Sequence, residues 1–110
     1  MKHLYGEFSQ EQVAGFVKSI QGSIFFLLLC GDPQTKDEYK NVDVNKNFRG
    51  LQLKLAGANE LFKQQSEIVS VMALLEAAKL EYNKADFEFS TYRKLILDAG
   101  AEISRMKVGD

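Results

Sequence analysis

The chain has 110 residues, 45% of them hydrophobic, which suffices for one domain whose core needs no disulfide or metal. Its 14 basic and 15 acidic residues give a formal net charge of −1, which argues against the basic surface typical of nucleic-acid-binding domains. The single cysteine, Cys30, excludes an intrachain disulfide and favours a reducing, cytoplasmic location.

The first expected helix covers residues 9–30 and follows an irregular N-terminal arm at 1–8. Ser9 and Gln12 have the spacing of a capping box, and apolar residues then recur every three or four positions. Gly31, which stands shortly before the only proline, is expected to end this helix.

Residues 24–30 of this helix are seven consecutive apolar side chains. Seven positions at about 100° each extend beyond one full turn, so no single face can hold them. The helix is therefore expected to be covered on more than one side. The run is much shorter than the roughly 20 apolar residues that span a bilayer, and polar residues precede it, so we expect no membrane association. The N-terminal residues also lack the apolar segment of a signal peptide.

A second set of residues lies opposite the main apolar stripe of this helix and forms the candidate interaction face. Two glycines in line with large apolar side chains would let another backbone approach closely, and a glycine inside a helix costs about 1 kcal/mol relative to alanine. Two interpretations stay open: the arm or a neighbouring helix of the same chain covers this face, or a second copy or another protein does. The face consists of Gly15, Gly22, Phe25, Phe26 and Leu29.

A long polar loop is expected at residues 31–46, and its length marks it as functional or mobile. The next helix, expected at 44–63, would start from a cap at Asp43 or Asn45. Its apolar seam, which Leu53 and Leu61 are expected to widen, consists of Phe48, Leu51, Leu55, Ala58 and Phe62.

A break is expected near residues 63–66, because the apolar seams before and after it are out of phase. The alternative is one bent helix of about 38 residues, which is long for a domain of this size. A third helix at 66–83 would then be capped by Ser66. Its expected seam consists of Ile68, Met72, Leu75, Lys79 and Tyr82.

The last expected helix covers residues 86–107 and would be capped by Asp86, and residues 108–110 are expected to fray. No stretch alternates between apolar and polar residues over a useful length, so the pattern predicts no strand. The chain is therefore expected to form one all-α domain over residues 1–110, a compact antiparallel bundle of four helices.

The residues available for catalysis are few. His3 is the only histidine and lies in the arm, while the Cys30 thiol lies in an apolar run and is expected to be inert. The segment 43–47 resembles the start of a calcium-binding EF-hand loop, but Phe48 replaces its glycine and Lys54 replaces its bidentate glutamate. We therefore expect no enzymatic activity, no metal site and no cofactor.

The expected function is that of a non-enzymatic helical interaction module, which forms a homodimer or binds another protein. The loop at 31–46 would be a second recognition surface. One alternative is a DNA-binding regulator, which acidic residues in the third helix disfavour (Glu67, Glu76 and Glu81). Another alternative is a carrier of a small apolar ligand, held in a closed cavity between the first helix and the Phe89/Tyr92 end of the last.

Overall fold

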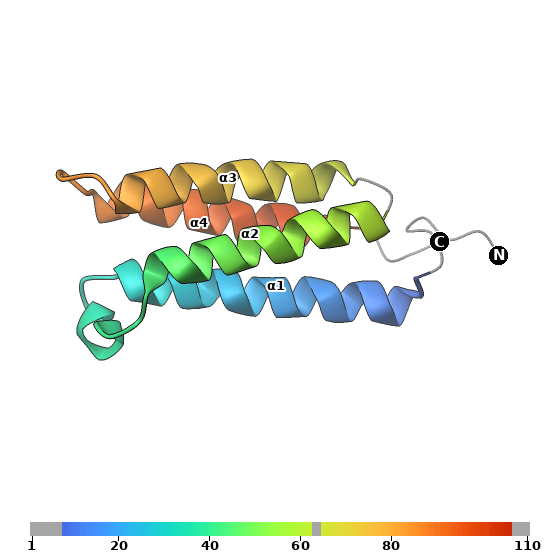
Figure 1. The fold of residues 1–110 in the computed structure, drawn as a ribbon, viewed down its shortest axis with the longest axis horizontal. Coiled ribbons are helices and arrows are strands. Elements are labelled where there is room, and N and C mark those ends of the chain that lie inside the picture. The colour runs from blue at the N-terminus through green and yellow to red at the C-terminus, as the bar shows by residue number, and fades with distance from the viewer. Residues whose placement is uncertain (1–7, 63–64, 107–110) are drawn as a thin grey trace.

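A computed structural model describes residues 8–62 and 65–106, which form four α-helices. These are α1 (Gln10–Gly31), α2 (Val44–Leu61), α3 (Ser66–Tyr82) and α4 (Phe89–Ile103), and a short 3₁₀ helix, η1 (Lys36–Tyr39), precedes α2. The chain reverses its direction at each connection, so consecutive helices are antiparallel (Figure 1). The expected all-α bundle of four helices is confirmed. The predictions for the arm at 1–7, for residues 63–64 and for the tail at 107–110 lie outside the described residues.

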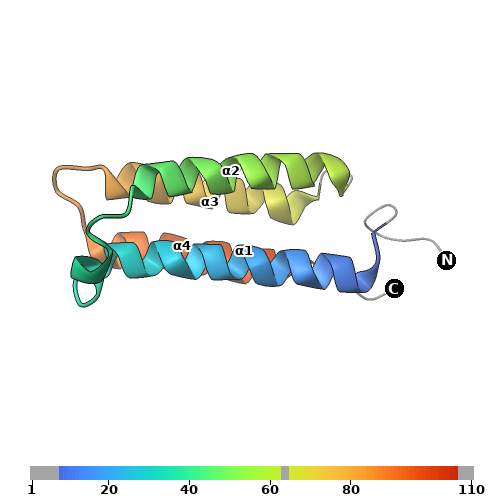
Figure 2. The same cartoon turned by 60° about the horizontal axis from the view of Figure 1, so that its bottom comes forward.

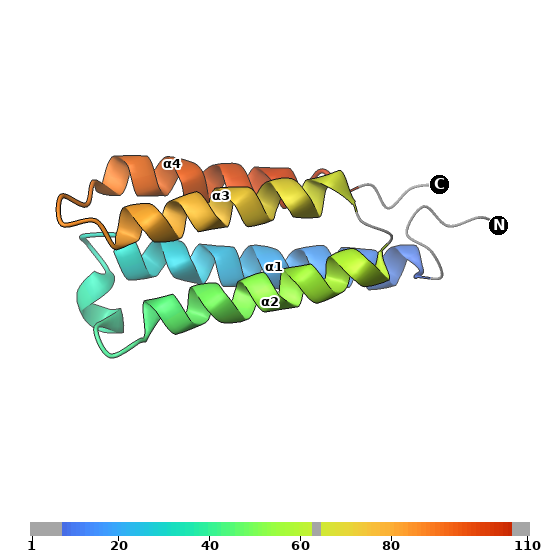
Figure 3. The same cartoon turned by 45° about the horizontal axis from the view of Figure 1, so that its top comes forward.

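The four helices form a square in which α1 lies beside α2 and α4, and α3 lies beside the same two helices. Figures 2 and 3 show these pairs from two sides. Among the four neighbouring pairs, α3 and α4 have the most extensive contact and α1 and α2 the least extensive. The loose α1/α2 pair leaves a groove that is described below.

Two helix starts follow directly from the local sequence. The capping box is present: the backbone N–H of Gln12 donates to Ser9 Oγ at 3.1 Å, and the backbone N–H of Ser9 donates to Gln12 Oε1 at 2.8 Å. Of the two caps considered for α2, Asp43 is the one used, since its Oδ1 accepts from the backbone N–H of Lys46 at 3.0 Å. Each side-chain oxygen satisfies an N–H group that the first turn of a helix leaves unpaired.

The other two predicted caps are wrong. Ser66 is the first residue of α3 rather than its cap, and the cap position is occupied by Gln65. Helix α4 begins at Phe89, three residues after Asp86, and its cap position is Glu88. The physical reason in α4 is a tertiary hydrogen bond, because the backbone N–H of Glu88 donates to the Glu81 carboxylate at 3.0 Å and holds the preceding segment out of the helix.

The break between α2 and α3 is confirmed, since α2 ends at Leu61 and α3 begins at Ser66. All four helices contribute side chains to one buried apolar cluster, and the predicted seam of α2 is buried throughout. However, Leu53 and Leu61 do not widen that seam, because their side chains are 69% and 62% exposed. In α3 the buried positions are Ile68, Val71, Leu75, Ala78 and Glu81. Of the other expected seam residues, Met72 and Tyr82 are half-buried and pack against the core, whereas the place of Lys79 in the seam is wrong.

Gly31 is the last residue of α1 rather than the residue that follows the helix. A Cβ atom at this position would lie 2.6 Å from Cε2 of Tyr92, whose side chain is fully buried. The helix needs a glycine here because the ring of Tyr92 occupies the space that a side chain would take.

Helix α1 is long and apolar enough to cross a membrane by length and composition, with a mean hydropathy of 1.8 over an 18-residue window. Within the bundle, 28% of that window is buried. The core helix of a soluble protein and a signal sequence near the N-terminus pass the same test, so this property alone does not place α1 in a membrane.

Candidate functional site

The five residues of the predicted interaction face do not form one surface. Phe25 lines a groove between α1 and α4, whereas Gly22 and Phe26 line a separate groove between α1 and α2. Phe25 and Phe26 are neighbours in a helix and therefore point about 100° apart. Helix α1 is the common wall of both grooves, which we call the α1/α4 groove and the α1/α2 groove.

The α1/α4 groove has an apolar lining and a volume of about 280 Å³. Phe25 and Leu97 stand at its edge with 57% and 43% of their surface exposed. The small residues Gly100 and Ala101 form part of its wall. It meets a second hollow of about 430 Å³ at a shared residue, Gln21. Besides Gln21, the second hollow is lined by Ala14, Val17, Lys18, Ser104 and Met106.

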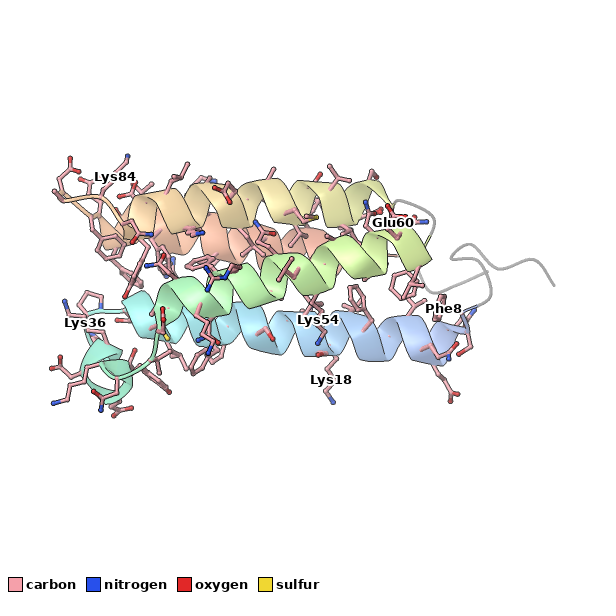
Figure 4. The ribbon with its side chains drawn as sticks, viewed as in Figure 1. Phe8, Lys18, Lys36, Lys54, Glu60 and Lys84 are labelled. Carbon is pink, nitrogen blue, oxygen red and sulfur yellow. The ribbon has the colours of Figure 1, made fainter. Side chains whose placement is uncertain are left out.

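The α1/α2 groove is larger, with a volume of about 860 Å³. Leu27 and Leu51 are buried apolar residues at its base, and two lysines of α2, Lys46 and Lys54, line it as well. The Lys54 ammonium donates a hydrogen bond of 2.9 Å to Ser19 Oγ, and its side chain points from α2 toward α1 (Figure 4). The remaining lining residues are Ser19, Gly22, Ser23, Phe26, Val42, Asp43, Asn47 and Gly50.

The segment between α1 and α2 covers part of the predicted face. The ring of Tyr39, the last residue of η1, packs edge-on against Phe26 with 5.4 Å between ring centroids. The Thr35 hydroxyl donates a 2.7 Å hydrogen bond to the Leu29 carbonyl oxygen, and both Phe26 and Leu29 are half-buried. The loop of the same chain thus covers Phe26 and Leu29, and it leaves Phe25 exposed. Three residues of η1 remain exposed on its outer side, namely Lys36, Asp37 and Glu38.

The two glycines of the predicted face have no close neighbours. A Cβ atom added at Gly15 or Gly22 would meet no atom within 4 Å, and the same holds for Gly50 and Gly57 of α2. All four glycines are exposed. The packing of the described residues therefore does not require glycine at these positions, although each glycine weakens its helix.

Two features considered for chemistry, the Cys30 thiol and the segment 43–47, contribute to the fold in the described part of the chain. Cys30 is buried, and this burial raises the pKa of its thiol, which disfavours the reactive thiolate. Within the part of the chain that the structure describes, no three His, Cys, Asp or Glu side chains gather closely enough to hold a metal ion. The EF-hand-like segment starts α2, and Asn45 exchanges side-chain hydrogen bonds of 3.0 and 2.7 Å with Asn83.

The place considered for an apolar ligand is occupied by the protein itself. The Tyr92 ring fills the space between α1 and the start of α4, and its hydroxyl donates a 2.6 Å hydrogen bond to the carbonyl oxygen of Leu27. The rings of Phe48, Tyr82, Phe87 and Phe89 surround it, with centroids 5.5–6.4 Å away.

The geometry of α2 and α3 bears on the DNA-binding alternative. A helix-turn-helix motif sets its two helices at about 90–120°. Here α2 and α3 instead run back along each other as an antiparallel pair (Figure 1). A hydrogen bond also joins the two helices, since Gln52 Nε2 donates to the Met72 carbonyl oxygen at 2.9 Å.

Sequence reasoning missed Leu97, Lys46 and Gly50, which come from helices that pack beside α1. Leu97 follows Ile96, a buried residue of α4, and is turned by about 100° from it. Which helix lies next to Leu97 is a property of the tertiary fold. Comparisons of the chain with protein-family models, with curated proteins and with solved structures give no match.

Proposed function

We propose that this protein is a non-enzymatic interaction module that self-associates through the α1/α4 groove. The observation that carries this proposal is the 57% exposure of Phe25, a large apolar side chain of the most apolar helix. Full burial of such a side chain contributes about 1.5–3 kcal/mol. Leu97, 43% exposed across the same groove, extends the apolar surface to α4.

A second copy of the chain fits this surface because projections and hollows occur on the same face. Phe25 and Leu97 project, whereas Gly100 and Ala101 provide small residues nearby. A twofold axis would place the projecting side chains of one copy against the small residues of the other, as an isologous interface requires. Two copies would also bring no charges together in the groove itself, because its lining contains no charged residue.

The non-enzymatic part of the proposal rests on Cys30, whose thiol is buried and has a raised pKa. Such a thiol is a poor nucleophile. The cytoplasmic location that we propose rests on the same unpaired, reduced cysteine.

The test is the solution mass, measured by light scattering over a range of protein concentrations. We expect the wild-type chain to approach twice its mass of 12.4 kDa as the concentration rises. Phe25→Asp should remain a monomer and stay folded, because the side chain is not in the core. Leu53→Asp is the matched control, since Leu53 is 69% exposed on α2 and does not line this groove. A wild-type chain that stays monomeric at high concentration would overturn the proposal.

A further inference from the structure

The α1/α2 groove differs from the self-association surface in its charge. Lys46 and Lys54 line it above an apolar base, and the only carboxylate in its lining is that of Asp43. The two ammonium groups outnumber this carboxylate, so the net charge of the lining is positive.

Exposed glycines accompany this groove on both of its walls. The hydrogen bond from Lys54 to Ser19 sets the register of the antiparallel pair. In that register Gly22 lies about level with Gly50, and two helical turns further along Gly15 lies about level with Gly57. A Cβ atom added at any of these four glycines would meet no neighbouring atom within 4 Å. Packing within the chain therefore does not require glycine at these positions. The space beside these four glycines would let the backbone of a partner approach closely.

We propose that the α1/α2 groove binds one amphipathic, acidic helix of another protein. Lys46 and Lys54 are eight positions apart, which corresponds to about 12 Å along α2. The partner helix would carry carboxylates about two turns apart to reach both ammonium groups. Its apolar seam would lie on Leu27 and Leu51, and its backbone would approach most closely beside Gly22 and Gly50.

The lysines argue against a second copy of the same groove as the occupant. A twofold axis through the groove would bring Lys46 and Lys54 of both copies together, and like charges at an interface suppress association. The groove also lies on the other side of α1 from Phe25, so an occupant here is compatible with a dimer formed through the α1/α4 groove. The inference therefore does not depend on the proposed self-association.

The experiment uses two synthetic helical peptides of about five turns that share one leucine seam. One peptide carries glutamates at seven-residue spacing beside the seam, and the other carries lysines at the same positions. Fluorescence anisotropy of labelled peptides against the full chain gives the two values of Kd. We expect the acidic peptide to bind at least about tenfold more tightly than the basic one, and the difference to shrink at high salt.

Variants of the groove show whether binding occurs there. Lys46→Glu/Lys54→Glu should reverse the preference between the two peptides. Gly22→Leu/Gly50→Leu should weaken acidic-peptide binding by about tenfold or more, while its thermal unfolding midpoint stays the same or rises. The control is Lys94→Glu, on the helix diagonally opposite α2, which should leave binding unchanged. The same measurements in the Phe25→Asp background should give the same values of Kd, so a failure of self-association would not affect this result.

Three outcomes would overturn the inference. The first is equal binding of the two peptides or binding of neither, and the second is an equal loss of binding in Lys94→Glu and in the groove variants. The third is a change in the solution mass of the chain caused by Gly22→Leu/Gly50→Leu, which would make a second copy the occupant of the groove.

Discussion

The Tyr92 hydroxyl donates a 2.6 Å hydrogen bond to the carbonyl oxygen of Leu27, which joins α4 to α1 inside the core. The two residues are 65 positions apart in the chain. Burial raises the pKa of the Tyr92 hydroxyl, which favours the protonated form that donates this hydrogen bond.

Removal of this hydroxyl should weaken the bundle without a change of its shape. Tyr92→Phe keeps the ring and loses the hydrogen bond, so we expect the free energy of unfolding to fall by about 1 kcal/mol. Urea denaturation followed by circular dichroism measures it. Tyr39→Phe, in the loop, is the control and should change the free energy by less than about 0.5 kcal/mol. An unchanged free energy for Tyr92→Phe would contradict the role of the bond.

Gly31→Ala should destabilise the protein although alanine favours helices. The new methyl group would lie 2.6 Å from the ring of Tyr92, which is fully buried, so the ring or the helix would have to shift. Overpacking of this kind costs about 1–3 kcal/mol, more than the gain in helix propensity. The measurement is again urea denaturation, and a stabilised Gly31→Ala variant would show that the ring can shift.

The four exposed glycines should respond in the opposite way. Alanine at Gly15, Gly22, Gly50 or Gly57 meets no atom within 4 Å, so each substitution should raise the free energy of unfolding by about 0.5–1 kcal/mol. Effects at well-separated positions add, so thermal melts of the single and the fourfold variants provide the comparison. A loss of stability at any of them would mean that the helix pairs approach there more closely than the structure shows.

The Glu81 carboxylate should make stability depend on acid pH. Its pKa is held below the ordinary value of 4.5, first by the hydrogen bond from the Glu88 backbone N–H and then by Lys84, whose ammonium lies 3.1 Å away. A lowered pKa in the folded state adds stability above the unfolded value, and this contribution is lost as the pH falls through the folded value. Wild type should therefore exceed Glu81→Gln in stability at pH 7, and the difference should shrink below pH 4.5. Urea melts of both proteins from neutral to acid pH test this, and a constant difference would count against it.

The Cys30 thiol should be almost unreactive in the native protein. It is buried and its pKa is raised, so both access and thiolate formation are limited. We expect a colorimetric disulfide reagent to modify it on the order of a hundredfold more slowly in buffer than in urea. Equal rates under the two conditions would show that the C-terminal end of α1 opens readily.

The local patterns of the sequence predicted much of the fold. Apolar spacing identified all four helices, and the Ser9/Gln12 pair identified the N-terminal cap of α1, because these features depend on neighbours within one turn. The errors come from tertiary contacts. Glu88 bonds to a carboxylate seven residues earlier and moves the start of α4, and the ring of Tyr92 rather than a turn explains Gly31.

The candidate site was predictable only in part, for the same reason. The sequence indicated that residues 24–30 of α1 are apolar around its whole circumference, and residues of this run line both grooves. It could not show that the loop would bring Tyr39 onto Phe26, because that contact depends on how the 3₁₀ helix folds back. The sequence also could not show that Lys46 and Lys54 line a groove, because that depends on the packing of α2 beside α1.

The division of the predicted interaction face between two grooves has a practical consequence for Phe25 and Phe26. These consecutive residues of one helix line different grooves. Fluorine labels on the two rings would therefore report separately on self-association and on peptide binding within a single sample. Spectra recorded during a peptide titration or a dilution series would then assign each partner to its own side of α1.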